Sequence, residues 1–278
     1  MDPIDVAELA LSLPEVDPRQ PSVARIYDFW LGGSQNFEAD REAGRRAAEA
    51  MPTLPAWARA NRVLLKHVVR RLAGECGIGQ FLDLGSGVPT VGNVHEVAQA
   101  VNPDARVVYV DIDPVAVAHA RVLLADNPLA HAALADLREP AAVLAHPMVR
   151  EAIDWSKPVA VLLFAVLHFI PEGEQAGRIV REFMAPCAPG SLLALSHGGV
   201  DRAAPAGQQD AAREYAARTG VWFTPRTADQ IGAWLAGLEV QPPGLADMHG
   251  WLPDLDEGPL QNVPMVAVVA RKPDHRTG

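Results

Sequence analysis

From residue 79 onward, short and almost uninterrupted apolar runs alternate with segments of helical spacing. The runs are FLDLG, RVVYVDID, AHAALAD, KPVAVLLFAVLHF and GSLLALSH. Between them, Val94, Val97, Ala98 and Val101 mark one face of a helix, and Pro114 opens another. Strands this apolar need cover on both faces, and strand–helix alternation builds a parallel sheet. We therefore predict an α/β, Rossmann-like fold with a mostly parallel sheet and helices on both faces.

The segments before the first and after the fifth of these strands complete the predicted domain. LEV and VPMVAVVARK fit a final hairpin, which gives a sheet of seven strands. Residues 1–78 read as an N-terminal helical cap of the same domain, because AWARANRVLLKHVVRRLAG is amphipathic and ends at Gly74. The predicted core spans residues 79–272 with a helical insert at about 201–236, and residues 273–278 form a polar tail.

Composition limits the kinds of partner that the protein is expected to bind. The 278 residues carry a formal net charge of −10, which argues against a nucleic-acid partner because phosphate binding relies on Lys and Arg. The two cysteines, Cys76 and Cys187, form no C-x-x-C pair and indicate neither a zinc site nor a disulfide, so no metal is expected. The N-terminus is acidic, unlike a secretory signal, and the longest apolar run is too short to span a bilayer and contains His168. We expect a cytoplasmic protein without a membrane segment.

The glycine-rich turn FLDLGSGVPTVG follows the first predicted strand. Glycines let a ligand approach the backbone, and the helix behind them directs free N–H groups at it. A plain strand–helix turn is the alternative. The third glycine of a dinucleotide fingerprint is Thr90, and Asp83 at the strand end would repel a pyrophosphate. Asp83 suits a ligand with an ammonium group and no phosphate, such as S-adenosylmethionine.

Two further acids follow successive strands. Asp111 ends VVYVD, where a carboxylate can accept protons from both ribose hydroxyls, whereas Asp113 is expected mainly to cap the next helix. Asp136 ends the third strand, where its carboxylate can accept from an adenine amine while the Leu137 amide donates to a ring nitrogen. A loop acid or helix cap is the alternative for Asp136. Because ligands of open α/β sheets bind along the carboxyl edge, the three acids together favour an adenosyl site.

FLDLGSG, VVYVDIDP, LADLREP and PVAVLLFAVLHFIPE, in this order, resemble a class I S-adenosylmethionine-dependent methyltransferase. ARIYDFWLGGSQNFEADR together with FLDLGSGVPTVGNVHEVAQ is similar, more narrowly, to a family of actinobacterial S-adenosyl methyltransferases whose substrates are largely unassigned. The resemblance runs from about Pro21 to Lys272. It implies a class I methyltransferase fold, S-adenosylmethionine as cofactor and S-adenosylhomocysteine as product.

The resemblance also implies roles for single residues. Gly85 and Gly87 would line the methionine moiety, and Phe164 and Ala165 would border the sulfonium and the acceptor cleft. Thr90 in place of the third glycine departs from the pattern and puts the path of the loop in doubt. The residues expected to bind the cofactor are Asp83, Gly85, Gly87, Asp111, Ile112, Asp136, Leu137, Phe164 and Ala165.

Methyl transfer depends largely on positioning, and a general base is needed only if the nucleophile must lose a proton early. His168 and His197 follow the fourth and fifth strands and have a suitable pKa range, although for each the alternative of a packed histidine is slightly favoured. Tyr27 is a third candidate. Arg59, Asn61 and Arg62 can reach a methionine carboxylate or solvate a helix face, and the second reading is slightly favoured.

The stretch RIYDFWLGGSQNFEADREAG, residues 25–44, crowds aromatic residues around a Gly-Gly pair. It fits a short helix over residues 23–31, a joint at Gly32–Gly33 and a charged helix from about Glu38. Either a lid over the cofactor or a static cap is consistent with it. The polar side chains expected to face inward are Tyr27, Asp28 and Asn36, and those expected to pack on the core are Phe29, Trp30 and Phe37.

The sequence therefore predicts a methyltransferase that acts on a small-molecule acceptor. A regulatory protein that binds S-adenosylmethionine or S-adenosylhomocysteine without turnover is the alternative, and an NAD-dependent oxidoreductase is disfavoured by Asp83 and Thr90. The sequence identifies neither the acceptor nor the oligomeric state.

Overall fold

The computed structural model describes residues 16–90, 92–171, 173–198, 216, 223–252 and 265–274. The elements in chain order are α2 (Val23–Trp30), α3 (Glu38–Ala50), α4 (Leu54–Gly74), β1 (Gln80–Leu84), α5 (Val94–Val101), β2 (Arg106–Asp111), α6 (Pro114–Leu123), β3 (Ala130–Leu134), α7 (Pro140–Ala145), α8 (Pro147–Ala152), β4 (Ala160–Phe164), the 3₁₀ helix η1 (Leu167–Phe169), α9 (Gly173–Met184), β5 (Leu192–Gly198), α11 (Ala228–Ala233), β6 (Glu239–Val240), β7 (Ala246–Asp247), α12 (Met248–Trp251) and β8 (Met265–Arg271).

The sheet has the order β3-β2-β1-β4-β5-β8-β6, with β7 also paired to β8. Strands β1 to β5 run parallel, and β8 is antiparallel to β5, β6 and β7. The predicted α/β fold and the closing hairpin are confirmed, but the sheet has eight strands rather than seven. The additional strand, β7, has two residues, which is too short to produce a recognisable alternation in the sequence.

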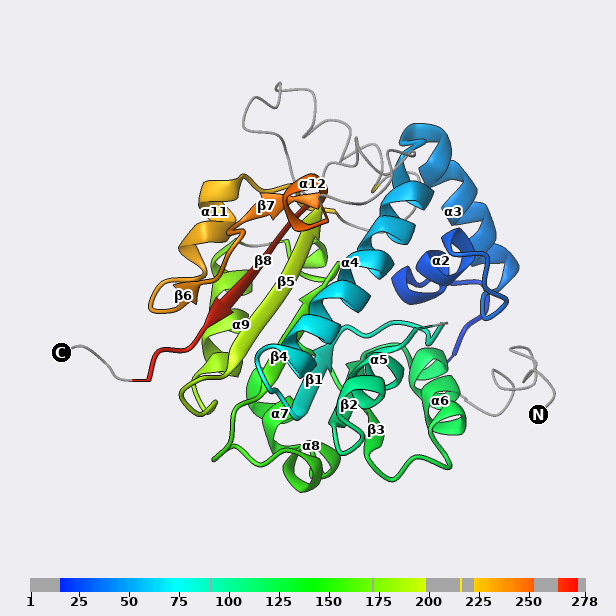
Figure 1. Ribbon diagram of the computed structural model, residues 1–278. Helices are drawn as coiled ribbons and strands as arrows, with labels where there is room; N and C mark the ends of the chain where they lie inside the picture. Colours follow the sequence, from blue (N-terminus) through cyan, green and yellow to red (C-terminus); the bar gives the residue numbers. More distant parts are fainter. Residues whose placement is uncertain are drawn as a thin grey trace.

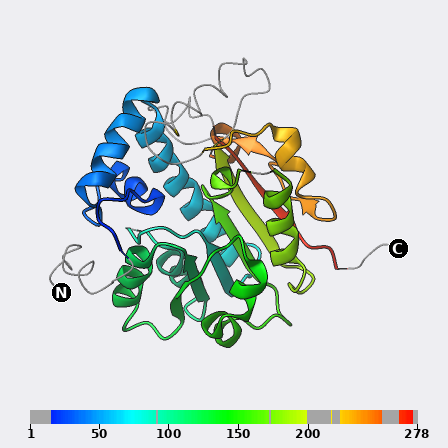
Figure 2. The same ribbon diagram turned by 180° about the vertical axis from the view of Figure 1, so that it is seen from behind.

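Helices cover both faces of the sheet, as expected for strands that are apolar on both sides. On one face, α4 lies across the strands beside α5 (Figure 1), and Leu64 and Val68 of α4 share a buried cluster with Phe81 and Val107. On the other face, seen in Figure 2, α9 packs with α8 and α11 around a second buried cluster that includes Ile179 and Phe183. Helix α4, within the predicted N-terminal cap, is thus a layer of the core.

Helices α2 and α3 form the outer part of the cap and lie together beside α4 (Figure 1). Their boundaries agree with the two helices predicted on either side of the Gly-Gly pair. Gly33 is required there, because a Cβ at this position would lie 1.9 Å from Oδ1 of Asp28. Of the predicted insert at 201–236, residues 201–215 and 217–222 lie outside the described part of the chain; α11 falls in the remainder.

Local signals set where the helices flanking the site begin. Asp113 caps α6 through its carboxylate, which accepts from the amides of Val115 (2.8 Å) and Ala116 (3.3 Å), and Pro114 follows at the first helical position. Glu96 accepts from the Asn93 amide at 3.1 Å and completes the predicted capping box of α5. Within the described residues, no helix is long and apolar enough to cross a membrane, and no group of three or more His, Cys, Asp or Glu is placed to hold a metal ion.

Candidate active site

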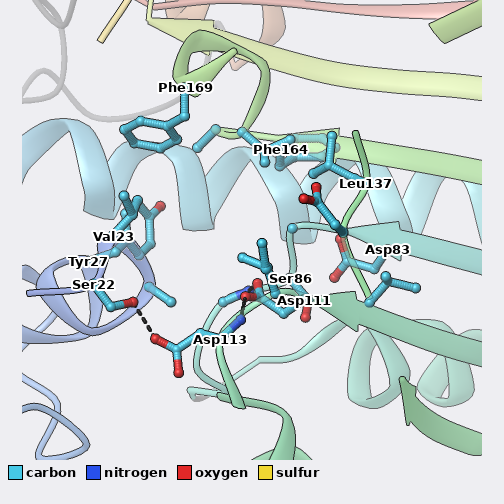
Figure 3. Close-up of a pocket in the computed structure, with 18 of the residues that line it drawn as sticks. Ser22, Val23, Tyr27, Asp83, Ser86, Asp111, Asp113, Leu137, Phe164 and Phe169 are labelled. Atoms are coloured by element: carbon cyan, nitrogen blue, oxygen red, sulfur yellow. Dashed lines mark hydrogen bonds between the residues drawn. The ribbon is translucent and has the colours of Figure 1, made fainter. Parts of the chain in front are cut away.

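A cavity of about 310 Å³ opens at the carboxyl edge of the sheet, where β1, β2, β3 and β4 end. Cap helix α2 and core helix α4 supply the facing wall. Figure 3 shows Val23 and Tyr27 of α2 on one side of this space and Asp83 and Leu137 on the other. All nine residues predicted from the sequence to bind the cofactor line this cavity, because the parallel strands bring their carboxyl ends to one edge of the sheet.

The glycine turn lies directly against the cavity. Gly85 and Gly87 have φ of +69° and +68°, the left-handed region that glycine adopts without strain. A Cβ on Gly85 would lie 2.4 Å from Cγ2 of Val166, whereas nothing lies within 4 Å of one on Gly87. The backbone at Gly87 is therefore open to a ligand.

Asp83 is buried in the floor of the cavity at the end of β1. Burial raises the pKa of its carboxyl to about 7, the positive charge of Arg62 opposes this shift, and the negative charge of Asp111 adds to it. A carboxyl that is only partly ionised at neutral pH is stabilised as the anion by a cationic ligand group. The position favours an ammonium and disfavours a phosphate.

Asp111, at the end of β2, holds the glycine turn as well as facing the cavity. Its carboxylate accepts from the amide of Gly87 at 2.7 Å and from the amide of Asp113 at 2.8 Å. Burial raises its pKa to about 6, although these backbone hydrogen bonds favour the anion. Next to it, the Ile112 side chain is 58% exposed and borders the cavity, so it offers an apolar surface for a ring.

The turn after β3 presents one backbone donor. The Leu137 amide has no acceptor in the part of the chain that the structure describes, and its side chain lines the cavity. The Asp136 carboxylate is already held by Arg138, whose Nε lies 2.8 and 2.9 Å from its two oxygens. Burial alone would raise the pKa of Asp136, but the hydrogen bonds from Arg138 outweigh it and leave the pKa below its usual value. The Leu137 amide is thus placed to donate to an adenine edge, whereas the Asp136 carboxylate is already in an ion pair with Arg138.

Helix α4 contributes two residues for which the sequence slightly favoured a role on a solvated surface. Arg59 is exposed, as that reading expects, but Asn61 and Arg62 line the cavity. Arg62 donates to the Gly92 carbonyl at 3.2 Å, and its buried Nε finds no partner among the described residues. Asn61 lies on the same face of α4 as buried Leu64 and Leu65. A polar residue on this otherwise apolar face was the sequence signal that could have placed Asn61 at the site.

A chain of hydrogen bonds lies behind the far end of the cavity. The Ala165 amide donates to Oγ of Ser196 (2.9 Å), Ser196 donates to Oδ1 of Asn61 (2.5 Å), and Nδ2 of Asn61 donates to the Tyr27 hydroxyl (3.0 Å). The Tyr27 hydroxyl in turn donates to the Ala58 carbonyl at 2.9 Å. Ala165 has φ of +54°, which is uncommon for a residue with a Cβ and costs about 1–3 kcal/mol. The network therefore fixes a strained turn at the end of β4, next to Phe164.

The two histidine candidates lie outside the cavity wall. His168 and His197 are 1% and 0% exposed, and neither is among the groups that line the cavity. Burial lowers the pKa of His197 to about 3 and that of His168 well below its usual value, and the charge of Arg226 acts in the same direction on both. Both imidazoles are thus neutral and packed with aromatic rings, and their part in proton transfer stays a prediction.

The cap residues differ in what they face. Tyr27 lines the cavity, as predicted, but Asp28 and Asn36 do not. Oδ2 of Asp28 accepts from the Gln35 amide and from Nδ2 of Asn36, both at 2.8 Å. The expectation that these two residues face the ligand was wrong, because their polar atoms close the turn around Gly33 instead.

The donor and acceptor set fits S-adenosylmethionine. Along the edge of the sheet lie an acid suited to an ammonium (Asp83) and an acid beside an open glycine turn (Asp111). Next to them, among apolar side chains, lies the Leu137 amide, which has no acceptor among the described residues. The orphaned Nε of Arg62 adds a donor for a carboxylate at the Asp83 end. This order matches the amino acid, ribose and adenine parts of the ligand.

Comparisons with known proteins give a family and similar solved structures. A family model described as S-adenosyl methyltransferase matches residues 10–273. A candidate methyltransferase from Thermobifida fusca YX is 43% identical, with a TM-score of 0.85 over 94% of this chain and 98% of that one. A DUF574 family protein from Streptomyces avermitilis is 40% identical, with a TM-score of 0.85 over 92% and 99%.

A more distant structure shares the fold alone. Human N-acetylserotonin methyltransferase, solved in complex with S-adenosylmethionine, is 16% identical, with a TM-score of 0.50 over 96% of this chain and 65% of that one. No curated protein shows a significant match to the chain.

Proposed function

Because the chain belongs to the S-adenosyl methyltransferase family, we propose that it transfers the methyl group of S-adenosylmethionine to a small-molecule acceptor. S-adenosylmethionine is the cofactor, as the family match establishes. The observation that carries the proposal is the order of Asp83, Asp111 and Leu137 along one sheet edge, next to an apolar wall at the end of β4.

Each of these residues has a part in holding the cofactor. Asp83 would pair with the ammonium and Arg62 with the carboxylate of the methionine moiety. Asp111 would accept from the ribose hydroxyls, and the Leu137 amide would donate to adenine, with Ile112 packed on the ring. When bound, S-adenosylmethionine supplies an electrophilic methyl group on a sulfonium for in-line displacement.

The end of the cavity beyond the ribose is apolar. Phe164, Phe169 and Ile170 line it, and such side chains exclude water from the reacting centre. Tyr27 borders the same region, and burial raises its pKa to about 12. Its hydroxyl thus stays protonated at neutral pH. We assign Tyr27 to orienting the acceptor rather than to removing a proton.

The size and charge of the site support a small-molecule acceptor. The cavity has a volume of about 310 Å³, and the charged groups on its wall are mostly acids. The chain as a whole carries a net charge of −10, which disfavours a nucleic-acid acceptor. Cys76 and Cys187 are unpaired, consistent with a cytoplasmic location.

Two measurements test the proposal. Calorimetry with S-adenosylmethionine, S-adenosylhomocysteine and NAD should show binding of both adenosyl ligands and none of NAD. Methyl-labelled S-adenosylmethionine, incubated with the protein and a small-molecule extract, should then label an extract component. Binding of NAD alone would refute the cofactor assignment, whereas adenosyl binding without transfer to any extract would favour a regulatory protein.

A further inference from the structure

Arg25, on cap helix α2, joins the cap to the core through a buried pair of acids. Its Nε lies 2.9 Å from Oδ2 of Asp40, and its Nη1 lies 2.9 Å from Oδ2 of Asp113. Its Nη2 donates to the Gln20 carbonyl at 2.6 Å. The Ser22 hydroxyl donates to the same oxygen of Asp113 (Figure 3). One guanidinium thus ties α2 and α3 to the turn between β2 and α6.

That turn also belongs to the cofactor site. The Asp113 amide donates to Oδ1 of Asp111, the residue assigned to the ribose, at 2.8 Å. The Asp113 carboxylate divides its oxygens, because Oδ1 caps α6 through the Val115 amide and Oδ2 receives Arg25. A change in the Arg25–Asp113 pair therefore acts on a peptide unit that contacts the ribose acid directly.

The helix that carries Arg25 also walls the cavity. Val23, Ala24 and Tyr27 of α2 and its N-cap residue Ser22 line the cavity. Figure 3 shows Ser22, Val23 and Tyr27 on this side. Near its C-terminal end, α2 is held on α4 by the Tyr27 hydroxyl, which donates to the Ala58 carbonyl, and by Trp30, which packs against the core. At its N-terminal end, Arg25 and Ser22 join it to Asp113. The ion pair is therefore one of the contacts that set the position of this end of the wall.

The two ion pairs of Arg25 favour a single low-energy position of the cap. The side chains of Arg25, Asp40 and Asp113 are 5%, 0% and 5% exposed. Separating a buried carboxylate from its cation is costly unless water replaces the cation. The cap is therefore closed with both pairs made, or opened far enough to hydrate all three groups.

We propose that Arg25 is a positioning residue for cofactor binding, whose pairing with Asp113 latches α2 over the cavity and slows the release of the adenosyl ligand. The proposal rests on the proposed function, since the ligand held is the methyltransferase cofactor or its product. Arg25 itself does not line the cavity, so it acts through α2 and the Asp113 turn.

The test measures release of labelled S-adenosylhomocysteine, displaced by an excess of unlabelled ligand. Arg25→Gln should raise the dissociation rate constant at least about tenfold and change the association rate constant much less, because differences among variants of one site fall mainly on dissociation. Arg25→Lys keeps the charge but lacks the planar fork that reaches both acids, so its rate should be intermediate.

A matched control is Arg45→Gln, which removes an exposed pair with Glu38 on the same cap and should leave release unchanged. If Arg25→Gln does not fold, Arg25→Lys, which keeps the buried positive charge, takes its place and should still speed release relative to the wild-type protein.

Two outcomes distinguish a failure of the latch proposal from a failure of the proposed function. Unchanged release in Arg25→Gln, or in Arg25→Lys where that variant replaces it, overturns the latch, even if the melting temperature falls. Failure of the wild-type protein to bind S-adenosylhomocysteine overturns the proposed function, and the latch with it.

Discussion

Asp83 offers the sharpest test of the site, because its ionisation should be coupled to cofactor binding. In the free protein burial raises its pKa to about 7. An ammonium group placed beside it favours the anion and lowers that pKa. Binding should therefore release a proton at neutral pH, and affinity should rise with pH until Asp83 is ionised in the free protein.

The magnitude follows from the ionised fraction. With a pKa of about 7, roughly three-quarters of the molecules are ionised at about pH 7.5 and roughly 3% at about pH 5.5, so affinity should fall about 25-fold over this range. Asp111, with a pKa of about 6, should add to the loss at the acid end.

The perturbation is Asp83→Asn, measured by calorimetry with S-adenosylhomocysteine at several pH values and in buffers of different ionisation enthalpy. Loss of a charge-assisted bond of about 1.5–3 kcal/mol should weaken binding about 10- to 150-fold near pH 7.5. The variant should also lose most of the pH dependence and the proton release. An unchanged pH profile in Asp83→Asn would refute the assignment of the ammonium to this residue.

Stability should change in the opposite direction. A carboxyl whose folded pKa exceeds its unfolded value favours the folded state fully at low pH, and that contribution is lost as pH rises through about 7. The cost at pH 7.5 is at most about 4 kcal/mol for the full shift. Asp83→Asn should therefore raise the melting temperature of the free protein by several degrees at pH 7.5 and little near pH 4. A lower melting temperature at both pH values would contradict the buried-charge argument.

Three further perturbations test other parts of the site. Asp111→Asn should weaken S-adenosylhomocysteine binding about tenfold or more by calorimetry, because an amide cannot accept from both ribose hydroxyls and the backbone; unchanged affinity would exclude the ribose role. Gly85→Ala should lower the free energy of unfolding by about 2–4 kcal/mol in urea titrations, because the new Cβ meets Val166 at 2.4 Å. Gly77→Ala is the control, because Gly77 also has a positive φ (+65°) but no atom within 4 Å of an added Cβ, so this variant measures the backbone strain alone. Equal losses of unfolding free energy in the two variants would disprove the clash with Val166. Arg62→Met should weaken S-adenosylhomocysteine about tenfold but not methylthioadenosine, which lacks the amino acid; equal losses would place Arg62 elsewhere.

Much of the fold and of the cofactor edge could be predicted from the sequence, because both depend on local order along the chain. Apolar runs of strand length specify a covered parallel sheet, and the residue after each run must then lie at the carboxyl edge. Asp83, Asp111 and Leu137 reached the cavity for this reason, and Asp113 caps its helix as its place before Pro114 predicts.

The facing wall of the site could not be predicted in this way. Asn61 and Arg62 line the cavity because of the angle at which α4 crosses the sheet, and Ser196 meets Asn61 across 135 positions of sequence. His168 and His197 had the position that the sequence criterion requires, yet both are fully buried and neither lines the cavity.

The sequence by itself determined which chemical group stands at the end of each strand. Because the strands are parallel, these groups must then lie at the same edge of the sheet. Only the tertiary structure decided what closes the site, because that depends on contacts between segments far apart in the chain. Arg25 illustrates the difference. In the sequence it is one basic residue ahead of an aromatic stretch, and in the fold it is the buried cation between Asp40 and Asp113, 15 and 88 positions away. A long-range ion pair leaves no local pattern, since its energy comes from burial that only the packed chain creates.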